Sequence, residues 1–482
     1  MFNPTIQRFL GMMLMLYSVS MLPPIGVSLW YRDGAWTPFA YTLLITLAVG
    51  TLLWAPRRRT RRDLALRDGF AVVALAWALL GLASALPLML AGHPHLSLAD
   101  AVFESFSGIT TTGATVMTGI DALPRGILYY RCQLQWLGGM GILVLAVAVL
   151  PMLGIGGMQL YRAEIPGPIK EQKLTPRIAE TAKALWLIYL GLTTACALAY
   201  WSFGMTPFDA LAHSFATVST GGFSTHDASL GYFHSARIDA VAVVFMYLAG
   251  INHALHYAAW RSASLRPYRL DSEVRGYTVI LGTTALITVT YLYITHTFDF
   301  VTALHHGIVQ AVSIGTSTGF TTAEYQRWPG FLPVLLIMVS FIGGCAGSTG
   351  GGMKVIRFLL LYKQGVREVA RLVHPSARIP VKVGGRVMPD RVVDAVWGFF
   401  AAYVAAFVLL MLLLMATGLD QVTAFSAVAA CINNMGPGLG LVGPNYNGVN
   451  DVAKWALSFA MLLGRLEIFT VLVLFSPAFW RR

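Results

Sequence analysis

Four short polar segments that contain glycine, each preceded by a short apolar stretch, constrain this fold more than any other feature. They cover residues 110–115, 219–223, 317–321 and 434–438. Each apolar stretch is too short to cross a bilayer, and longer apolar stretches flank it. Any one copy also fits a simple turn between two helices. Four copies at similar intervals predict four loops around one axis, each between a half-helix and a full span.

We expect these loops to line a cation pathway. Glycine adopts backbone angles that other residues resist, so a glycine loop can turn its carbonyl oxygens toward an axis, where they replace the water shell of a cation. The expected filter residues are Thr111, Thr112, Gly113, Ser219, Thr220, Gly221, Ser317, Thr318, Gly319, Asn434, Met435 and Gly436. Of these, Gly113, Gly221, Gly319 and Gly436 are expected to need glycine dihedral angles.

The composition is that of an integral membrane protein. Only 12% of the 482 residues are charged, against about 25% in soluble proteins. Uncharged stretches cover residues 9–31, 34–56, 69–99, 132–161, 184–208, 240–260, 276–298, 328–353 and 395–419. The first is too long for a cleavable signal peptide. We therefore predict an all-α membrane protein with ten spans, in which four pseudo-symmetric helix–loop–helix repeats surround one pore and a two-helix hairpin precedes them.

The expected division of the chain follows these repeats. It comprises an N-terminal transmembrane hairpin (1–62), pore repeat 1 (63–160), pore repeat 2 (161–265), pore repeat 3 with a glycine-rich gate loop (266–362), a cytoplasmic basic loop (363–390) and pore repeat 4 (391–482). Half-helices are expected over about 99–110, 208–218, 302–316 and 421–433. Single continuous helices are expected for the second spans of repeats 1, 2 and 4, over about 127–153, 236–260 and 452–478.

Basic residues indicate the orientation. The net charge is +12, and the basic residues cluster at 57–62, 162–183, 261–275, 363–391 and 481–482, beside the spans. By the positive-inside rule these segments and both termini are cytoplasmic, and a nucleic-acid partner is not expected. The cluster at 363–391 has seven basic residues and a plausible short hairpin around Gly384 and Gly385. We expect it to dock a regulator or a second subunit, with orientation charges in solvent as the alternative.

A glycine-rich stretch within repeat 3 predicts a gate. Residues 343–352 contain six glycines, and each costs about 1 kcal/mol inside a helix, so the helix should break there. The expected gate residues are Gly344, Cys345, Ala346, Gly347, Ser348, Thr349, Gly350, Gly351, Gly352 and Arg465. A close helix contact through small residues is the alternative for the glycines.

Several charged or polar residues within apolar stretches leave two interpretations open. Arg465 either gates the pathway or clamps carbonyl groups, and it is not expected to form a simple pair with Glu467 two positions later. Glu104 either adds negative charge at the entrance or accepts hydrogen bonds behind the loop. Packing or hydrogen bonding is favoured over metal binding for three half-helix histidines, His213, His305 and His306. The four cysteines lie in apolar or glycine-rich stretches and are expected to be free.

These segments resemble the TrkH/TrkG branch of the Trk/Ktr/HKT superfamily of potassium transporters nearly end to end. The resemblance rests on the four loops and on residues 135–141 (QWLGGMG), 343–357 (GGCAGSTGGGMKVIR), 433–440 (NNMGPGLG) and 463–469 (LGRLEIF). It implies potassium uptake across a bacterial inner membrane, a homodimer, and a cytoplasmic nucleotide-binding ring, TrkA, as regulator. It also implies an arginine at the position of Arg465. Met435 departs from the smaller aliphatic residue expected there.

The leading hypothesis is thus a gated, channel-like potassium pathway, with potassium ions at the loops and no covalently bound cofactor. The alternative is a secondary transporter that couples potassium to protons or sodium, for which inverted repeats would be expected. The sequence contains no HExxH, GxSxG or Walker motif, so we do not expect an enzyme.

Overall fold

The protein is described here from a computed structural model of the 482-residue chain, which describes residues 4–57, 66–148 and 178–480. Among these residues, six helices are long and apolar enough to cross a membrane, and up to eight if each of two sharply bent helix pairs counts as one span. Most of the basic clusters at 57–62 and 162–183 lies outside the described residues.

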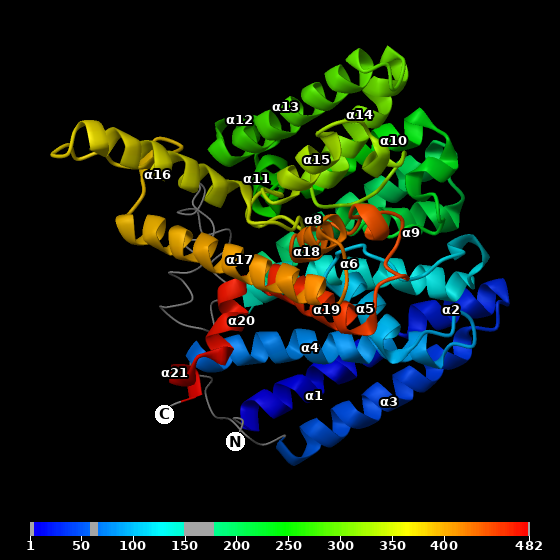
Figure 1. The fold of residues 1–482 in the computed structure, drawn as a ribbon. Helices are drawn as coiled ribbons and strands as arrows, with labels where there is room; N and C mark the ends of the chain where they lie inside the picture. Colours follow the sequence, from blue (N-terminus) through cyan, green and yellow to red (C-terminus); the bar gives the residue numbers. More distant parts are fainter. Residues whose placement is uncertain (1–3, 58–65, 149–177, 481–482) are drawn as a thin grey trace.

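An N-terminal hairpin lies along one edge of the molecule (Figure 1). It consists of α1 (Pro4–Val19), α2 (Leu22–Tyr31) and α3 (Trp36–Trp54). Helices α1 and α3 approach closely at Gly11 and Gly50, where a Cβ on either glycine would collide with the backbone of the other helix. Small residues at such a crossing allow the close packing that holds helices together in lipid.

Four units follow the hairpin. The first contains α4 (Leu66–Leu90), α5 (Leu98–Ile109) and α6 (Arg125–Ala148). The second contains α8 (Ile178–Ser202), α9 (Pro207–Val218), α10 (Ala236–Ala249) and α11 (His253–Ser262). The third contains α12 (Arg266–Leu270), α13 (Ser272–Ile294), α14 (Phe300–Gly315), α15 (Leu332–Ser340) and α16 (Val355–Val373). The fourth contains α17 (Asp390–Ala416), α18 (Gln421–Ile432), α19 (Asp451–Leu466), α20 (Ile468–Phe475) and α21 (Pro477–Trp480).

The short helices α5, α9, α14 and α18 match the expected half-helices closely. Each begins after a side chain that accepts backbone N–H groups of the first turn, and these residues are Ser97, Thr206, Asp299 and Asp420. Because such caps satisfy donors that have no partner within a helix, they fix where each short helix starts. The start of each half-helix is therefore determined by residues next to it in the sequence.

The prediction of one continuous helix is wrong for two of the spans. The stretch 236–260 is broken into α10 and α11, which meet at an angle of 96°, and Asn252 caps the second helix by accepting the N–H of Ala254. The stretch 452–478 is broken at Glu467, where α19 and α20 meet at 115°. Glu467 has a φ of 64°, and its carboxylate pairs with Arg357 of α16 at 2.8 Å. By contrast, the expected break within repeat 3 is present, because α15 ends at Ser340 and α16 begins at Val355.

A small β-hairpin follows α16, as the sequence suggested. Strands β1 (Lys382–Val383) and β2 (Arg386–Val387) pair antiparallel, with Val383 opposite Arg386. The two connecting residues, Gly384 and Gly385, both have positive φ, as a tight two-residue hairpin turn requires.

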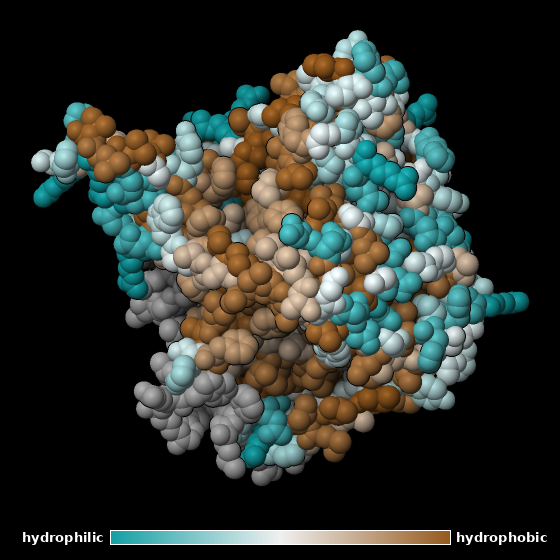
Figure 2. Space-filling model, in the orientation of Figure 1, coloured by the Kyte–Doolittle hydropathy of each residue, from teal (hydrophilic) through white to brown (hydrophobic). Residues whose placement is uncertain are grey.

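The polar surface lies mainly at the two ends of the helices. Segments 110–124, 219–235, 316–331 and 433–450 connect each short helix to the next helix, and we call the end they form the mouth face. The chain termini and α16 lie at the opposite end (Figure 1). On the side shown in Figure 2, hydrophobic residues cover the middle and hydrophilic residues gather toward the mouth face and along α16. This distribution is the one expected for a bundle that crosses a bilayer.

Ion pairs join neighbouring units near the mouth face. In three of them a helix of one unit pairs with the short helix of the next: Arg125 with Asp209 at 3.9 Å, Asp239 with His305 at 2.7 Å, and Lys454 with Asp100 at 2.5 Å. A fourth contact joins Asp121 to His226 at 2.5 Å. These contacts thus tie the first unit to the second and the fourth, and the second unit to the third.

His226 makes one of these ties dependent on pH. Its Nε2 also lies 3.6 Å from a carboxylate oxygen of Asp209. Burial lowers the pKa of His226, but the two carboxylates outweigh that effect and raise the pKa above its ordinary value of 6.5. The stabilisation is therefore complete below pH 6.5 and is lost as the pH rises through the folded-state pKa.

We predict that His226→Gln lowers the melting temperature of the purified protein more at about pH 6 than at about pH 9. The matched control is Arg125→Gln, because arginine keeps its charge throughout this range. Thermal unfolding in detergent at both pH values measures the difference. An equal loss for His226→Gln at the two pH values would contradict the assignment.

Candidate ion pathway

The four short helices end with one shared hydrogen-bond pattern. In α5, the N–H of Thr112 donates to the carbonyl of Ser107 at 2.8 Å, and the N–H of Thr111 donates to Gly108 at 3.0 Å. In the other three short helices, the bond equivalent to that from Thr112 to Ser107 is also 2.8 Å long. It joins Gly221 to Ala216, Thr318 to Ser313 and Met435 to Ala430. This is a Schellman cap, which turns the chain through one left-handed residue. That residue is Thr111, Thr220, Ser317 or Asn434, with φ of 55°, 54°, 60° and 50°.

A glycine with positive φ follows two residues after each left-handed residue. These glycines are Gly113, Gly222, Gly319 and Gly436, with φ of 82°, 78°, 85° and 96°. The expectation for Gly221 is therefore wrong, and the second loop is shifted by one residue: Thr220, Gly221 and Gly222 correspond to Thr111, Thr112 and Gly113. Gly221 is needed for space instead, because a Cβ there would collide with the amide of Gln135.

The four loops contact one another in a closed ring. At each positive-φ glycine, an added Cβ would overlap a carbonyl oxygen of another loop. The pairs are Gly113 with Gly221, Gly222 with Thr318, Gly319 with Met435, and Gly436 with Thr112. The contacted carbonyls occupy equivalent positions, so each loop abuts the next and the fourth abuts the first. The sequence-expected loop residues are thus brought together, apart from the shift in the second loop.

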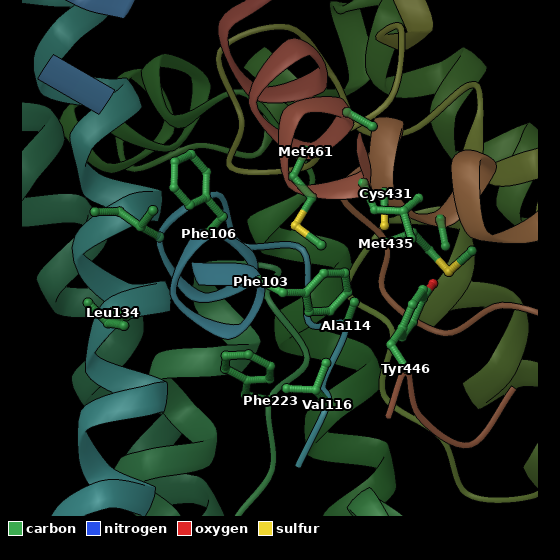
Figure 3. Close-up of a cluster of buried hydrophobic side chains, with 14 of the residues drawn as sticks. Phe103, Phe106, Ala114, Val116, Leu134, Phe223, Cys431, Met435, Tyr446 and Met461 are labelled. Atoms are coloured by element: carbon green, nitrogen blue, oxygen red, sulfur yellow. The ribbon is translucent and has the colours of Figure 1, made fainter. Parts of the chain in front are cut away.

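A cavity of about 420 Å³ opens above this ring on the mouth face, and the four positive-φ glycines form part of its lining. Buried side chains pack behind the loops: Figure 3 shows Phe103, Val116 and Phe223 beside loop residue Ala114, with Tyr446 opposite Phe103. The ring centroids of Phe103 and Tyr446 are 5.1 Å apart. The Tyr446 hydroxyl donates to the carbonyl of Gly436 at 2.8 Å, so this packing also positions a loop carbonyl.

Glu104 lies behind the first loop rather than at the entrance. Its buried carboxylate accepts hydrogen bonds from the Thr115 hydroxyl at 3.0 Å and the Val116 N–H at 2.9 Å, and it pairs with Arg131 at 2.8 Å.

The half-helix histidines also form hydrogen bonds. His213 contacts the hydroxyl of Ser224 and His306 contacts that of Thr322, both at 2.9 Å, while His305 pairs with Asp239.

The glycine-rich segment 341–354 lies across the ends of three short helices. The Thr349 hydroxyl donates to the carbonyl of Val218, the last residue of α9, at 3.0 Å. The N–H of Gly351 donates to the hydroxyl of Ser317 at 2.5 Å, and that of Gly352 to the carbonyl of Asn433 at 3.1 Å. All the sequence-expected gate residues from Gly344 to Gly352 lie in this segment. The segment thus contacts the C-terminal ends of α9 and α18 and Ser317 of the third loop.

Arg465 connects this segment to two other helices. The side chain is only 5% exposed, and its guanidinium donates to the carbonyls of Thr349 at 2.9 Å and Gly138 at 3.2 Å. The residue itself belongs to α19, and Gly138 belongs to α6. The two carbonyl contacts fit the clamp interpretation, while contact with Thr349 places the charge against the segment expected to be the gate.

Sequence reasoning missed several charged residues around the same segment. Glu273 accepts the N–H groups of Ala346 at 2.7 Å and Ile356 at 3.1 Å, and the Lys354 ammonium donates to the carbonyl of Gly350. Lys354 and Arg357 lie within the motif 343–357, and their charge next to an apolar stretch could have indicated a functional role. Glu273 gave no such signal, because it follows the helix cap Asp271 like an ordinary first-turn acidic residue.

Comparison with known proteins gives one consistent result. Residues 37–482 match the model of a family described as TrkH, cation transport protein. The Trk system potassium uptake protein TrkH of Halomonas elongata is 57% identical over 477 residues, covering 99% of both chains. TrkH of Escherichia coli K12 is 53% identical over 477 residues, with the same coverage. TrkG of Escherichia coli K12 is 43% identical over 471 residues, covering 98% of this chain and 97% of TrkG.

A solved structure agrees with the fold. The crystal structure of the potassium transporter TrkH from Vibrio parahaemolyticus superposes with a TM-score of 0.93 at 54% identity, covering 100% of both chains. The apolar helices described above are therefore those of a multi-pass membrane protein, and the chain belongs to the TrkH family of cation transport proteins.

Proposed function

We propose that this protein carries potassium ions into the cell through the ring of four loops. The observation that supports this most is the closed series of contacts between each positive-φ glycine and the equivalent carbonyl of the next loop. Backbone carbonyls gathered around one axis replace the hydration shell of a cation. The C-terminal ends of α5, α9, α14 and α18 meet at the ring, and each contributes about half a negative charge.

Potassium is the proposed substrate because relatives of high identity are named potassium uptake proteins. The loops supply one shared layer of equivalent carbonyls rather than the stacked layers of a potassium channel, so we propose a modest preference over sodium. The alternative, a secondary transporter that couples potassium to protons or sodium, has less support, since the four units repeat in parallel around the ring. The transport needs no covalently bound cofactor, and catalysis is not proposed.

We propose that the segment 343–352 closes the pathway below the ring and that Arg465 holds it there. The segment reaches the ends of three of the four short helices, and the guanidinium of Arg465 donates to the carbonyl of Thr349. A positive charge beside the pathway also raises the barrier for a cation. Opening would break these few hydrogen bonds, and α16 joins the segment directly to the basic loop 363–390.

The resemblance to the TrkH/TrkG branch supports the proposed assembly and location. We propose a homodimer in the bacterial inner membrane, with both termini and the basic loop in the cytoplasm and a TrkA-type nucleotide-binding ring as the regulator. The proposed functional division keeps the hairpin 1–62 outside the pore and assigns repeats 1–4 to 63–160, 161–265, 266–362 and 391–482.

The direct test is a flux assay with the purified full-length protein in lipid vesicles, under gradients of potassium, rubidium or sodium, with and without the regulator. Potassium and rubidium flux that exceeds sodium flux supports the proposal. Flux equal to that of protein-free vesicles in every condition, with folded protein present, overturns it.

The ring predicts different outcomes for two adjacent glycines. Gly222→Ser should reduce potassium flux by about tenfold or more, because a left-handed non-glycine residue costs about 1–2 kcal/mol and its Cβ meets the carbonyl of Thr318. Gly221→Ser should have a smaller effect, since Gly221 does not have a positive φ and its added Cβ meets the end of the Gln135 side chain rather than backbone. Flux per folded molecule measures both. A larger loss for Gly221→Ser would place the second loop in the other register.

The gate predicts leakage without the regulator. Arg465→Ala, or deletion within residues 345–351, should raise regulator-free potassium flux. Arg465→Lys should also leak, because a compact ammonium cannot span the two carbonyls that the guanidinium holds. Exposed Arg269 of α12 is the control, and Arg269→Ala should not leak. If the Arg465→Ala and deletion proteins fold but show no more regulator-free potassium flux than wild type, the gate lies elsewhere.

The basic loop predicts a docking surface. Arg367 is buried and pairs with Asp390 at 2.7 Å, so it should be kept, whereas exposed Arg378, Lys382 and Arg391 are available for contact. Changing these three to glutamate should weaken co-purification of the regulator through charge repulsion. Size-exclusion chromatography separates this result from loss of the dimer. Undiminished binding together with an intact dimer would leave these residues as orientation charges only.

A further inference from the structure

One buried ion pair near the loops has no part in the proposed pathway so far. Glu104 in α5 and Arg131 in α6 are each 1% exposed, and their side chains meet at 2.8 Å. Buried charges are costly unless they are paired and hydrogen-bonded. This pair is fully engaged, and the groups it engages are loop residues.

Arg131 binds two loops at once. Its Nη2 donates to the Thr115 hydroxyl of the first loop at 3.0 Å, and its Nη1 donates to the carbonyl of Ser224, just past the second loop, at 3.2 Å. The guanidinium also lies 4.3 Å from the ring centroid of Phe223. A planar guanidinium with several fixed donors suits such a junction, whereas lysine offers one compact charge.

Gln135 extends the same attachment by one helical turn. Its Nε2 donates to the carbonyl of Gly221 at 2.6 Å, and its Oε1 accepts the N–H of Phe223 at 3.0 Å. Residues four apart lie on one face of a helix. One face of α6, in the first unit, therefore holds the loop of the second unit.

The other loops are held by neutral groups among the described residues that contact them. The Ser313 hydroxyl donates to the carbonyl of Phe320 in the third loop at 2.7 Å. The Tyr325 hydroxyl donates to the carbonyl of Pro437 in the fourth loop at 2.9 Å. The Arg131 side chain, which also lines the mouth cavity, thus brings a full charge to the junction of the first two loops.

We propose that Glu104 and Arg131 are positioning residues that determine ion preference at the mouth of the ring. Arg131 sets the distance between the first and second loops, and Glu104 cancels its charge so that the cavity remains favourable for a cation. The inference rests on the proposed function, since it assigns the pair a role in potassium transport through that ring.

Charge and position are separable by four variants. Glu104→Gln leaves the guanidinium unbalanced and should raise the KM for potassium, whereas Arg131→Gln leaves the carboxylate unbalanced and should lower it. An unbalanced unit charge about 10 Å from a monovalent ion changes its affinity by about tenfold at an effective dielectric constant of about 20. The double variant should restore the wild-type KM. Arg131→Lys should also keep that KM, because the charge remains.

The preference for potassium over sodium tests whether Arg131 positions the two loops. Arg131→Gln, Arg131→Lys and the double variant all lose the bridge from Thr115 to Ser224, so each should relax the preference for potassium over sodium by severalfold. A merely structural role would lower transport only in proportion to the amount of folded protein, with KM and preference unchanged. Tyr268→Phe is the control: it removes a hydroxyl that contacts His256 at 2.8 Å, between α11 and α12, and should change neither quantity.

The experiment is potassium and sodium uptake by the full-length protein in vesicles of neutral lipid, with the regulator present, normalised to folded protein. Opposite KM shifts for the single variants and relaxed preference in Arg131→Lys support the inference. If the single charge-removing variants do not fold, Arg131→Lys and the double variant decide: relaxed preference supports the inference, and wild-type preference in both overturns it. Wild-type protein without potassium flux, both with and without the regulator, would instead refute the proposed function itself.

Discussion

The structure depends on backbone approaching backbone without a side chain between. Each positive-φ glycine of a loop faces a carbonyl of the next loop, and no Cβ fits at any of the four positions. The same constraint applies one layer behind, where Gly138 of α6 lies against the carbonyl of Ile109 and Gly464 of α19 lies against that of Ile432. Glycine is costly inside a helix, so its use at these contacts shows how closely the second helices pack on the ends of the short ones.

The helix ends also carry strain. The left-handed position of a Schellman cap usually belongs to glycine, but here threonine, serine or asparagine occupies it in all four copies. Such strain persists only where the surrounding structure over-determines it. Two cap hydrogen bonds and the contact with the next loop do so here. Asn434 shows the cross-links most clearly, because its amide donates both to the hydroxyl of Thr112 and to the carbonyl of Met461.

The glycine-rich segment 343–352 is less firmly fixed in one conformation than the helix ends. A few hydrogen bonds to the ends of the short helices and to Arg465 hold it, and its glycines make several backbone conformations similar in energy. The helices on its far side begin at two strained residues, Lys354 with φ of 77° and Glu467 with φ of 64°. Arg357 connects them, since it follows Lys354 by one helical turn and pairs with Glu467. Movement of α16 in the proposed mechanism would therefore act on both hinges together.

The sequence by itself determined the features that short-range chemistry controls. Stretch lengths, helix caps such as Ser97 and Asp420, and the run of glycines at 343–352 placed the four short helices, the loops after them and the break between α15 and α16. Only the tertiary structure decided the rest. Gly221 and Gly222 are equivalent in local sequence, and contact with Gln135 and Thr318 selects which one takes positive φ. The bend falls at Glu467, which is neither glycine nor proline, and it coincides with an ion pair to Arg357, 110 residues away. Glu104 likewise found its partner on another helix. These outcomes depend on groups that come together only when the helices pack, and no local pattern encodes that meeting.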